Sequence, residues 1–125
     1  MGLRLLLALA ALAAVAAAYG LWKHPPRLRG VDLAGIGVQG PAIVEFTAPH
    51  CAPCRAAVPH LEAVARESGV PLVQVDVAER PDLARSHRIR TVPTIVVAGR
   101  SGRVLGVWTH LPEGNAVIEA ARTAR

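Results

Sequence analysis

Apolar and polar positions divide this chain into one long apolar run and a series of short elements. Leu5 to Trp22 contains no charged residue, and a helix of that length reaches about 27 Å, enough for a bilayer core. Basic residues flank the run, with Arg4 before it and Lys23 after it. The pattern predicts an N-terminal transmembrane anchor or signal segment over residues 1–23, followed by a basic linker and lead-in over 24–40.

Beyond residue 40, short apolar runs alternate with segments of helical spacing. The expected strands are 42–46, 71–77, 93–98 and 103–108, and the expected helices are 56–67, 79–87 and 112–121. The three- and four-residue spacing of the first helix places Val58, Leu61, Val64 and Ala65 on one face. A strand–helix–strand unit followed by a helix, a hairpin and a helix predicts an α/β domain with a mixed sheet over residues 41–125. For Val31–Gly40, both a short edge strand and an irregular lead-in fit the pattern.

The formal net charge of +5 would suit nucleic acid or a membrane surface, and its location decides between them. Residues 31–125 contain ten arginines and nine acidic residues, so the globular part is nearly neutral. The charge of the globular part therefore gives no support to nucleic-acid binding, and we expect no nucleic-acid partner. We expect four arginines to form a solvated face, or one that contacts anionic lipid if it is turned to a membrane: Arg80, Arg85, Arg88 and Arg90.

Both cysteines of the chain lie between the first predicted strand and the helix after it, as Cys51-Ala52-Pro53-Cys54. The spacing places Cys51 at the helix mouth, where unpaired amide N–H groups and the positive end of the dipole favour a thiolate. Cys54 lies one turn inside the helix. Such a pair can exchange a disulfide with another protein, since Cys51 attacks and Cys54 resolves the mixed disulfide.

Two other interpretations of the pair stay open, a structural disulfide and half of a zinc site. A structural zinc ion requires four ligands, and beyond the cysteines only scattered histidines are candidates. We expect His60, His87 and His110 at the surface. No metal ligand is therefore assigned.

Several runs occur together at informative spacings: Ala48–Arg55 around the cysteines, Pro59 in the following helix, Val75–Val77, Pro81–Leu83, and Thr91-Val92-Pro93-Thr94 at the head of a late strand. Together they make residues 41–122 resemble a thioredoxin-family domain. The resemblance implies a thioredoxin-like fold, a central mixed sheet of about four strands flanked by helices. It also implies that the Val92–Pro93 bond is cis and lies against the cysteines.

The chain departs from the family pattern at several positions: Thr47 and His50 replace tryptophans, Glu45 replaces a buried aspartate, Gln74 replaces a lysine, and Ala52 replaces a glycine. The family's first strand–helix unit is missing or reduced to Val31–Gly40. These changes bear on redox potential and partner choice more than on the chemistry. A protonated His50 would stabilise the Cys51 thiolate, and Glu45 without the lysine should be harder to ionise when buried.

The sequence therefore predicts a thiol–disulfide oxidoreductase that works as a reductase on protein partners. The resemblance implies catalytic roles for Cys51, Cys54, Glu45 and Pro93, with Glu45 accepting the proton of Cys54, and substrate contacts at His50, Pro53, Thr91 and Val92. No cofactor is needed because the dithiol carries both electrons, but a separate electron donor is. We expect a monomer. A copper- or zinc-binding module and a non-catalytic adaptor remain as alternatives.

The location of the domain depends on the N-terminal segment. A signal peptidase could cut after Ala16–Ala18, but the apolar run continues past that site, which favours an uncleaved single-pass anchor in the cell membrane. The basic residues after the run slightly favour a cytoplasmic domain. A thiol protein gains more from a tether outside the cytoplasm, where the tether prevents its loss. We therefore expect the domain to be extracytoplasmic.

Overall fold

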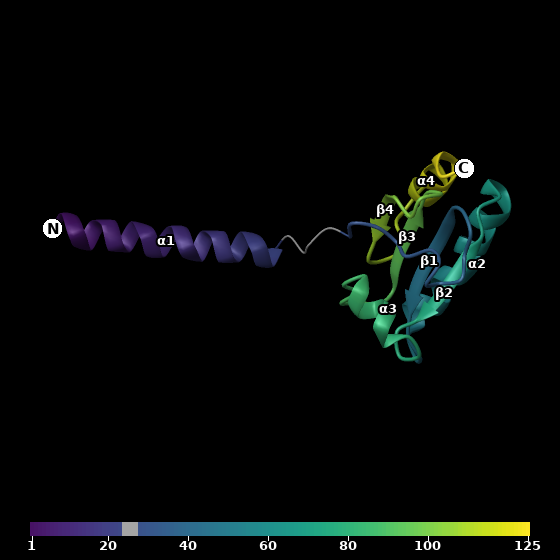
Figure 1. Ribbon diagram of the computed structural model, residues 1–125, viewed down its shortest axis with the longest axis horizontal. Coiled ribbons are helices and arrows are strands. Elements are labelled where there is room, and N and C mark those ends of the chain that lie inside the picture. The colour runs from purple at the N-terminus through teal and green to yellow at the C-terminus, as the bar shows by residue number, and fades with distance from the viewer. Residues whose placement is uncertain (24–27) are drawn as a thin grey trace.

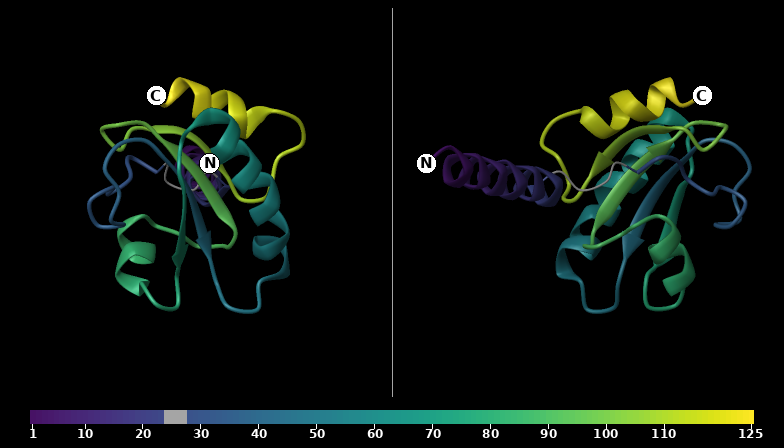
Figure 2. Two further views of the ribbon diagram at one scale, coloured as in Figure 1. Left: turned by 90° about the vertical axis from the view of Figure 1, so that its right-hand side faces the viewer. Right: turned by 60° about the vertical axis from the view of Figure 1, so that its left-hand side comes forward.

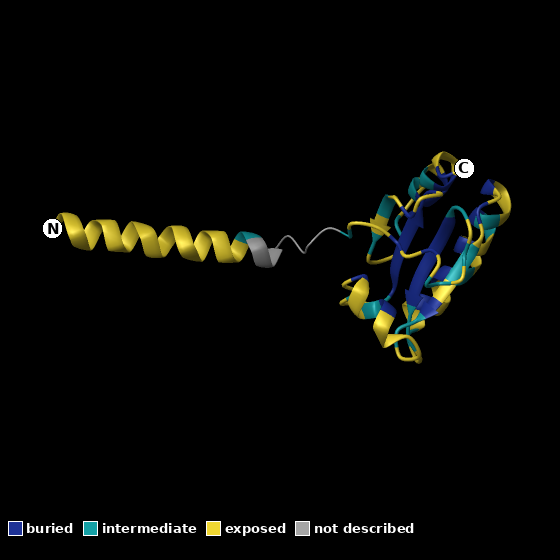
Figure 3. Cartoon of the chain, in the orientation of Figure 1, coloured by how far each residue is buried: buried dark blue, intermediate teal, exposed yellow. Residues whose placement is uncertain are grey.

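A computed structural model describes the backbone of residues 1–23 and 28–125, and the side chains of 1–20 and 28–125 (Figure 1). Its first element is α1, Gly2–Lys23. Within it, Gly2–Gly20 is long and apolar enough to cross a membrane, with a mean hydropathy of 2.0, and none of it is buried in the protein (Figure 3). A signal segment would have the same properties. Residues 24–27 of the predicted linker, with Pro25 and Pro26, lie outside the described part.

The elements after the linker follow the predicted order, with shifted ends. They are β1 (Ala42–Thr47), α2 (Ala52–Ser68), β2 (Leu72–Asp76), α3 (Pro81–Ser86), β3 (Thr94–Ala98), β4 (Val104–Trp108) and α4 (Ala116–Thr123). The expected start of the last helix at Pro112 is wrong. Gly114 has a φ of 74°, a left-handed conformation that an α-helix does not accommodate, so α4 begins after it.

The four strands form one mixed sheet, as predicted, and their order is β2-β1-β3-β4 (Figure 2). Strand β1 pairs in parallel with β2 and antiparallel with β3, and β3 pairs antiparallel with β4. Because β1 has a strand on each side, its residues from Ala42 to Phe46 are all buried. This buried central strand leads directly to the cysteine turn.

Alternation along the central strands gives each face of the sheet its own core. On one face, Ile43 and Ile95 pack with α2 and α4; on the other, Val44 and Phe46 pack with α3 and the lead-in. Figure 2 shows α2 and α3 on opposite sides of the sheet. Of the predicted helix face, Leu61 and Val64 are buried and Ala65 packs against the core, whereas Val58 is half-buried and is not part of that core cluster. The buried face of α2 is formed by Cys54, Ala57, Leu61, Val64 and Ser68.

The lead-in before β1 contains no strand, so the irregular alternative is the correct one. Its Val31 and Leu33 are nonetheless buried in the core on the α3 side of the sheet. The Val31 N–H donates to the Gly102 carbonyl in the β3–β4 turn at 2.8 Å. The division of the chain at residue 41 stays a prediction, but the core already includes residues before it.

His87 is not a surface residue, contrary to the sequence-based expectation, since only 4% of it is exposed. The Asp32 N–H donates to its Nε2 at 3.0 Å, so Nε2 carries no proton, and Nδ1 donates to the Leu83 carbonyl at 2.8 Å. The centroid of the His87 ring also lies 5.4 Å from the centroid of the Phe46 ring. His87 therefore fastens the lead-in to α3, a contact that links residues 55 positions apart.

Replacing this imidazole should destabilise the fold. We expect His87→Ala to lower the free energy of unfolding by about 2–4 kcal/mol, because it leaves a cavity and an unsatisfied Asp32 N–H. Urea denaturation measures the change. The control is His110→Ala at an exposed position, with an expected effect within about 0.5 kcal/mol. Equal, small effects for the two variants would show that His87 does not hold the lead-in.

Candidate active site

The cysteine turn connects the buried strand β1 to α2. Cys51 is the N-cap of α2, with φ −89° and ψ 99°. Its carbonyl accepts the first helical hydrogen bond, from the Arg55 N–H at 3.2 Å, and its Sγ accepts from the Cys54 N–H at 3.2 Å. Pro53 fits in the first turn because a proline there forfeits no helical hydrogen bond. The cap shows why the expected start at residue 56 is too late.

The two cysteines are joined by a disulfide, with their Cα atoms 5.3 Å apart. Their burial differs: Cys51 is half-buried, whereas Cys54 is only 1% exposed. A partner sulfur can therefore approach Cys51 but not Cys54. This asymmetry distinguishes an attacking from a resolving sulfur.

His50 lies directly before Cys51 and is exposed. Its φ is 61°, in the left-handed region that is uncommon for residues other than glycine. This conformation makes the reversal that brings Cys51 to the end of the helix. Its imidazole is thus at the entrance of the site, and its predicted influence on the Cys51 thiolate stays a prediction.

Glu45 is fully buried in β1. Two residues after Ile43, it faces the side of the sheet that α2 covers, where the buried face of the helix includes Cys54. Gln74, its register partner in β2, donates from Nε2 to Oε1 at 3.0 Å. Within the described part of the chain, Oε2 has no hydrogen-bond partner. Burial raises the pKa of Glu45, and the Gln74 hydrogen bond lowers it by a smaller amount.

The Val92–Pro93 peptide bond is cis, as the family resemblance implied. Pro93 is buried, Val92 is half-buried and Thr91 is exposed. The Thr94 hydroxyl donates to the Thr91 carbonyl at 2.7 Å and so closes the loop across the cis bond. The part of the loop that a partner can reach is therefore Thr91 and Val92.

The cysteine turn and the cis-proline loop leave the sheet at the same edge. The register pairs Phe46 in β1 with Thr94 in β3, which places Pro93 next to Thr47 at the start of the cysteine turn. On the other side of β1, the Val77 N–H donates to the Thr47 carbonyl at 2.9 Å. The segment that leads into the cysteine turn and the cis-proline loop therefore lie beside each other at this edge. One surface hollow there, of about 320 Å³, is lined by Val77, Pro81, Ala84, Arg85, Ile89, Arg90, Thr91 and Val92.

Sequence reasoning missed one member of the site. In the sequence Gln74 is only a substitute for the family's lysine, whereas the structure makes it the hydrogen-bond partner of Glu45. The signal was present in the position of the two residues, because each is the fourth residue of its predicted strand, 42–46 and 71–77, and the two strands pair in parallel. Among residues 1–23 and 28–125, no three His, Cys, Asp or Glu side chains gather where they could share a metal ion.

Comparison with known proteins gives consistent matches. The family model described as Thioredoxin matches residues 36–111. A thioredoxin of Porphyra purpurea is 35% identical over 75 residues, which cover 58% of this chain and 70% of that protein. Thioredoxin 1 of Synechococcus elongatus has the same identity and coverage.

Solved structures match the same domain. Fasciola hepatica thioredoxin, 27% identical, has a TM-score of 0.59 over 70% of this chain and 84% of its own. Thioredoxin 1 of Thermosipho africanus, 21% identical, supports the fold alone, with a TM-score of 0.58 over 66% of this chain and 91% of its own.

The buried carboxyl should make stability depend on pH. Because the pKa of Glu45 is raised, the folded chain holds a proton that the unfolded chain releases at the ordinary glutamate value. The free energy of unfolding should then fall as pH rises from the ordinary to the raised pKa, by at most about 1.4 kcal/mol per pH unit. Urea denaturation of the oxidised protein across this range should show that Glu45→Gln lacks the decline. The exposed Glu62→Gln is the control, and a wild-type decline that persists in Glu45→Gln would contradict the assignment.

Proposed function

The chain belongs to the thioredoxin family and is a thiol–disulfide oxidoreductase, and from this premise we propose that it reduces disulfides of protein partners while held at a membrane by α1. One observation carries the proposal: a reachable sulfur caps α2, and a buried sulfur lies one turn behind it on the same helix. The direction of electron flow and the tether are the new parts of the proposal.

The first step uses the cap of α2. In the reduced protein, the Cys54 N–H and the positive end of the helix stabilise a thiolate on Cys51. This thiolate attacks one sulfur of the partner disulfide, and a mixed disulfide forms. The partner's other sulfur leaves as a thiolate and takes a proton from solvent.

The second step uses the buried side of the same helix. Glu45 takes the thiol proton of Cys54, a role supported by its place on the same side of the sheet, its unpartnered Oε2 and its raised pKa. The Cys54 thiolate then attacks the Cys51 sulfur and expels the second partner sulfur. The partner has gained two electrons, and the chain is left with the Cys51–Cys54 disulfide that the structure contains. A separate dithiol donor must reduce it again.

The cis-proline loop supplies the binding surface for the partner. An extended partner chain would pair with the backbone at Thr91 and Val92, the reachable part of the loop, while Pro93 keeps the loop at the cysteine edge. His50 and Pro53, both exposed, would contact the partner on the cysteine side. Hydrogen bonds between backbones depend little on the side chains of the partner, so the loop could bind more than one partner protein.

The tether places this chemistry at a membrane. The apolar, unburied Gly2–Gly20 segment of α1 supports this membrane anchor. The alternative is that the same segment is a signal sequence that is cleaved. We place the domain outside the cytoplasm, where a tether keeps it at the cell. Reporters that function on one side of the membrane only, fused after Arg125, test the side.

Two cysteine variants test the direction and the order of attack. With a dithiol donor present, the wild type should reduce insulin, whereas Cys54→Ser should stop at a mixed disulfide with insulin through Cys51. Cys51→Ser, the matched control, should form none, because Cys54 is buried. Non-reducing electrophoresis and mass spectrometry identify the adducts. Insulin reduction that survives Cys51→Ser, or stoichiometric copper or zinc without thiol exchange, would contradict the proposal.

A further inference from the structure

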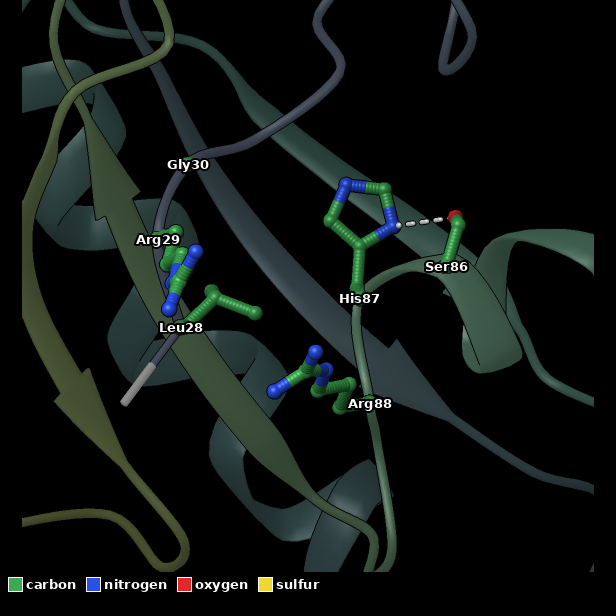
Figure 4. Close-up of a pocket in the computed structure, with 6 residues that line it drawn as sticks. All are labelled: Leu28, Arg29, Gly30, Ser86, His87 and Arg88. Carbon is green, nitrogen blue, oxygen red and sulfur yellow. Dashed lines mark hydrogen bonds between the residues drawn. The ribbon is translucent and has the colours of Figure 1, made fainter. Parts of the chain in front are cut away.

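The point at which the tether joins the domain is fixed by packing. Leu28, the first described residue after α1, is half-buried and packs against the core on the α3 side of the sheet. Together with His87 and Arg88 it lines a hollow of about 150 Å³ (Figure 4). His87 is itself held by hydrogen bonds to Asp32 and Leu83. The chain therefore enters the domain at a defined place on its surface.

The distance from that place to the membrane is limited by chain length. Helix α1 ends at Lys23, and Leu28 follows five peptide units later. Even a fully extended chain spans at most about 18 Å over five residues. If α1 crosses the bilayer and ends at its surface, the domain face around Leu28 cannot move farther from the lipid headgroups than that.

This face is basic. Arg29, Arg88 and Arg90 are all exposed, and each lines one of the two hollows that Leu28 also lines. We call these three residues the tether face. Figure 4 shows the side chains of Arg29 and Arg88 close to Leu28. The sequence has no acidic residue between Asp82 and Glu113. Two acidic residues lie near α3: Asp82 pairs with Arg80 at 3.0 Å at the other end of the helix, and Asp32 in the lead-in interacts electrostatically with the same Arg80.

Arg88 adds an independent observation. Its φ is 55°, a left-handed conformation after the end of α3, where glycine would be the unstrained residue. A residue other than glycine that is kept in a strained conformation points to a use for its side chain. At this position the side chain adds a cation beside the tether.

We propose that the tether face docks on an anionic bilayer surface, with its three guanidinium groups bound to lipid phosphates. This inference rests on α1 remaining attached, as in the proposed function. Docking would fix the orientation of the domain relative to the membrane. Because Thr91 and Val92 follow Arg90 directly, docking also holds the cis-proline loop close to the headgroups.

The rate of arginine modification in the full-length protein measures this docking directly. The chain is reconstituted in vesicles of phosphatidylcholine alone or mixed with phosphatidylglycerol, treated with phenylglyoxal, and analysed by peptide mass spectrometry. In the mixed vesicles, modification of Arg88 and Arg90 should slow by about fivefold or more, and high salt should abolish the protection. Arg66 in α2 and Arg122 in α4 are internal controls on the opposite side of the sheet, with expected rates independent of the lipid (Figure 2).

Each outcome has a separate meaning. Equal rates for Arg88 and Arg90 in both kinds of vesicle, or equal protection of Arg66 and Arg122, would overturn docking. The Arg88→Gln/Arg90→Gln variant should lose the protection of Arg29, whereas Arg66→Gln/Arg122→Gln should keep it. Release of the protein by alkaline carbonate would remove the anchor and the docking with it. Failure to reduce insulin would instead count against the proposed function alone.

Discussion

The capping of α2 by Cys51 is the interaction on which the rest of the site depends. One residue provides the carbonyl that accepts the first helical hydrogen bond and the sulfur that accepts the Cys54 N–H. A cysteine in this position meets the unpaired amides of the helix mouth, so the contact that caps the helix is also the one that, in the proposed mechanism, stabilises the Cys51 thiolate. Strand β1, buried between two neighbours, fixes where that helix begins.

Strand β1 also buries an ionisable side chain, Glu45, and this burial is energetically unfavourable. A carboxyl group buried in a central strand, with one oxygen unpartnered in the described part of the chain, is unfavourable when ionised. Gln74 offsets part of that cost through one neutral hydrogen bond. The group is therefore well suited to gain and lose a proton. A buried ionisable group with a raised pKa is typical of active sites.

The sequence predicted the strands, the sheet and the cysteine turn because each depends on local pattern or spacing. Contacts between distant segments were not predictable in this way. His87 looks like a surface residue until the fold brings the Asp32 N–H to it from 55 positions away. The late start of α4 depends on the left-handed Gly114, and the early start of α2 on a sulfur cap. The cis bond before Pro93 was predictable only from the family resemblance.

The central claim is that the helix mouth makes Cys51 the reactive sulfur while burial keeps Cys54 unreactive. The alkylation rate of each cysteine in the reduced protein, followed by mass spectrometry against pH, tests it most directly. The account predicts rapid alkylation of Cys51 even at mildly acidic pH, where an ordinary thiol reacts slowly, and much slower alkylation of Cys54. Equal rates for the two cysteines, both rising only at the alkaline pH typical of an ordinary thiol, would contradict it.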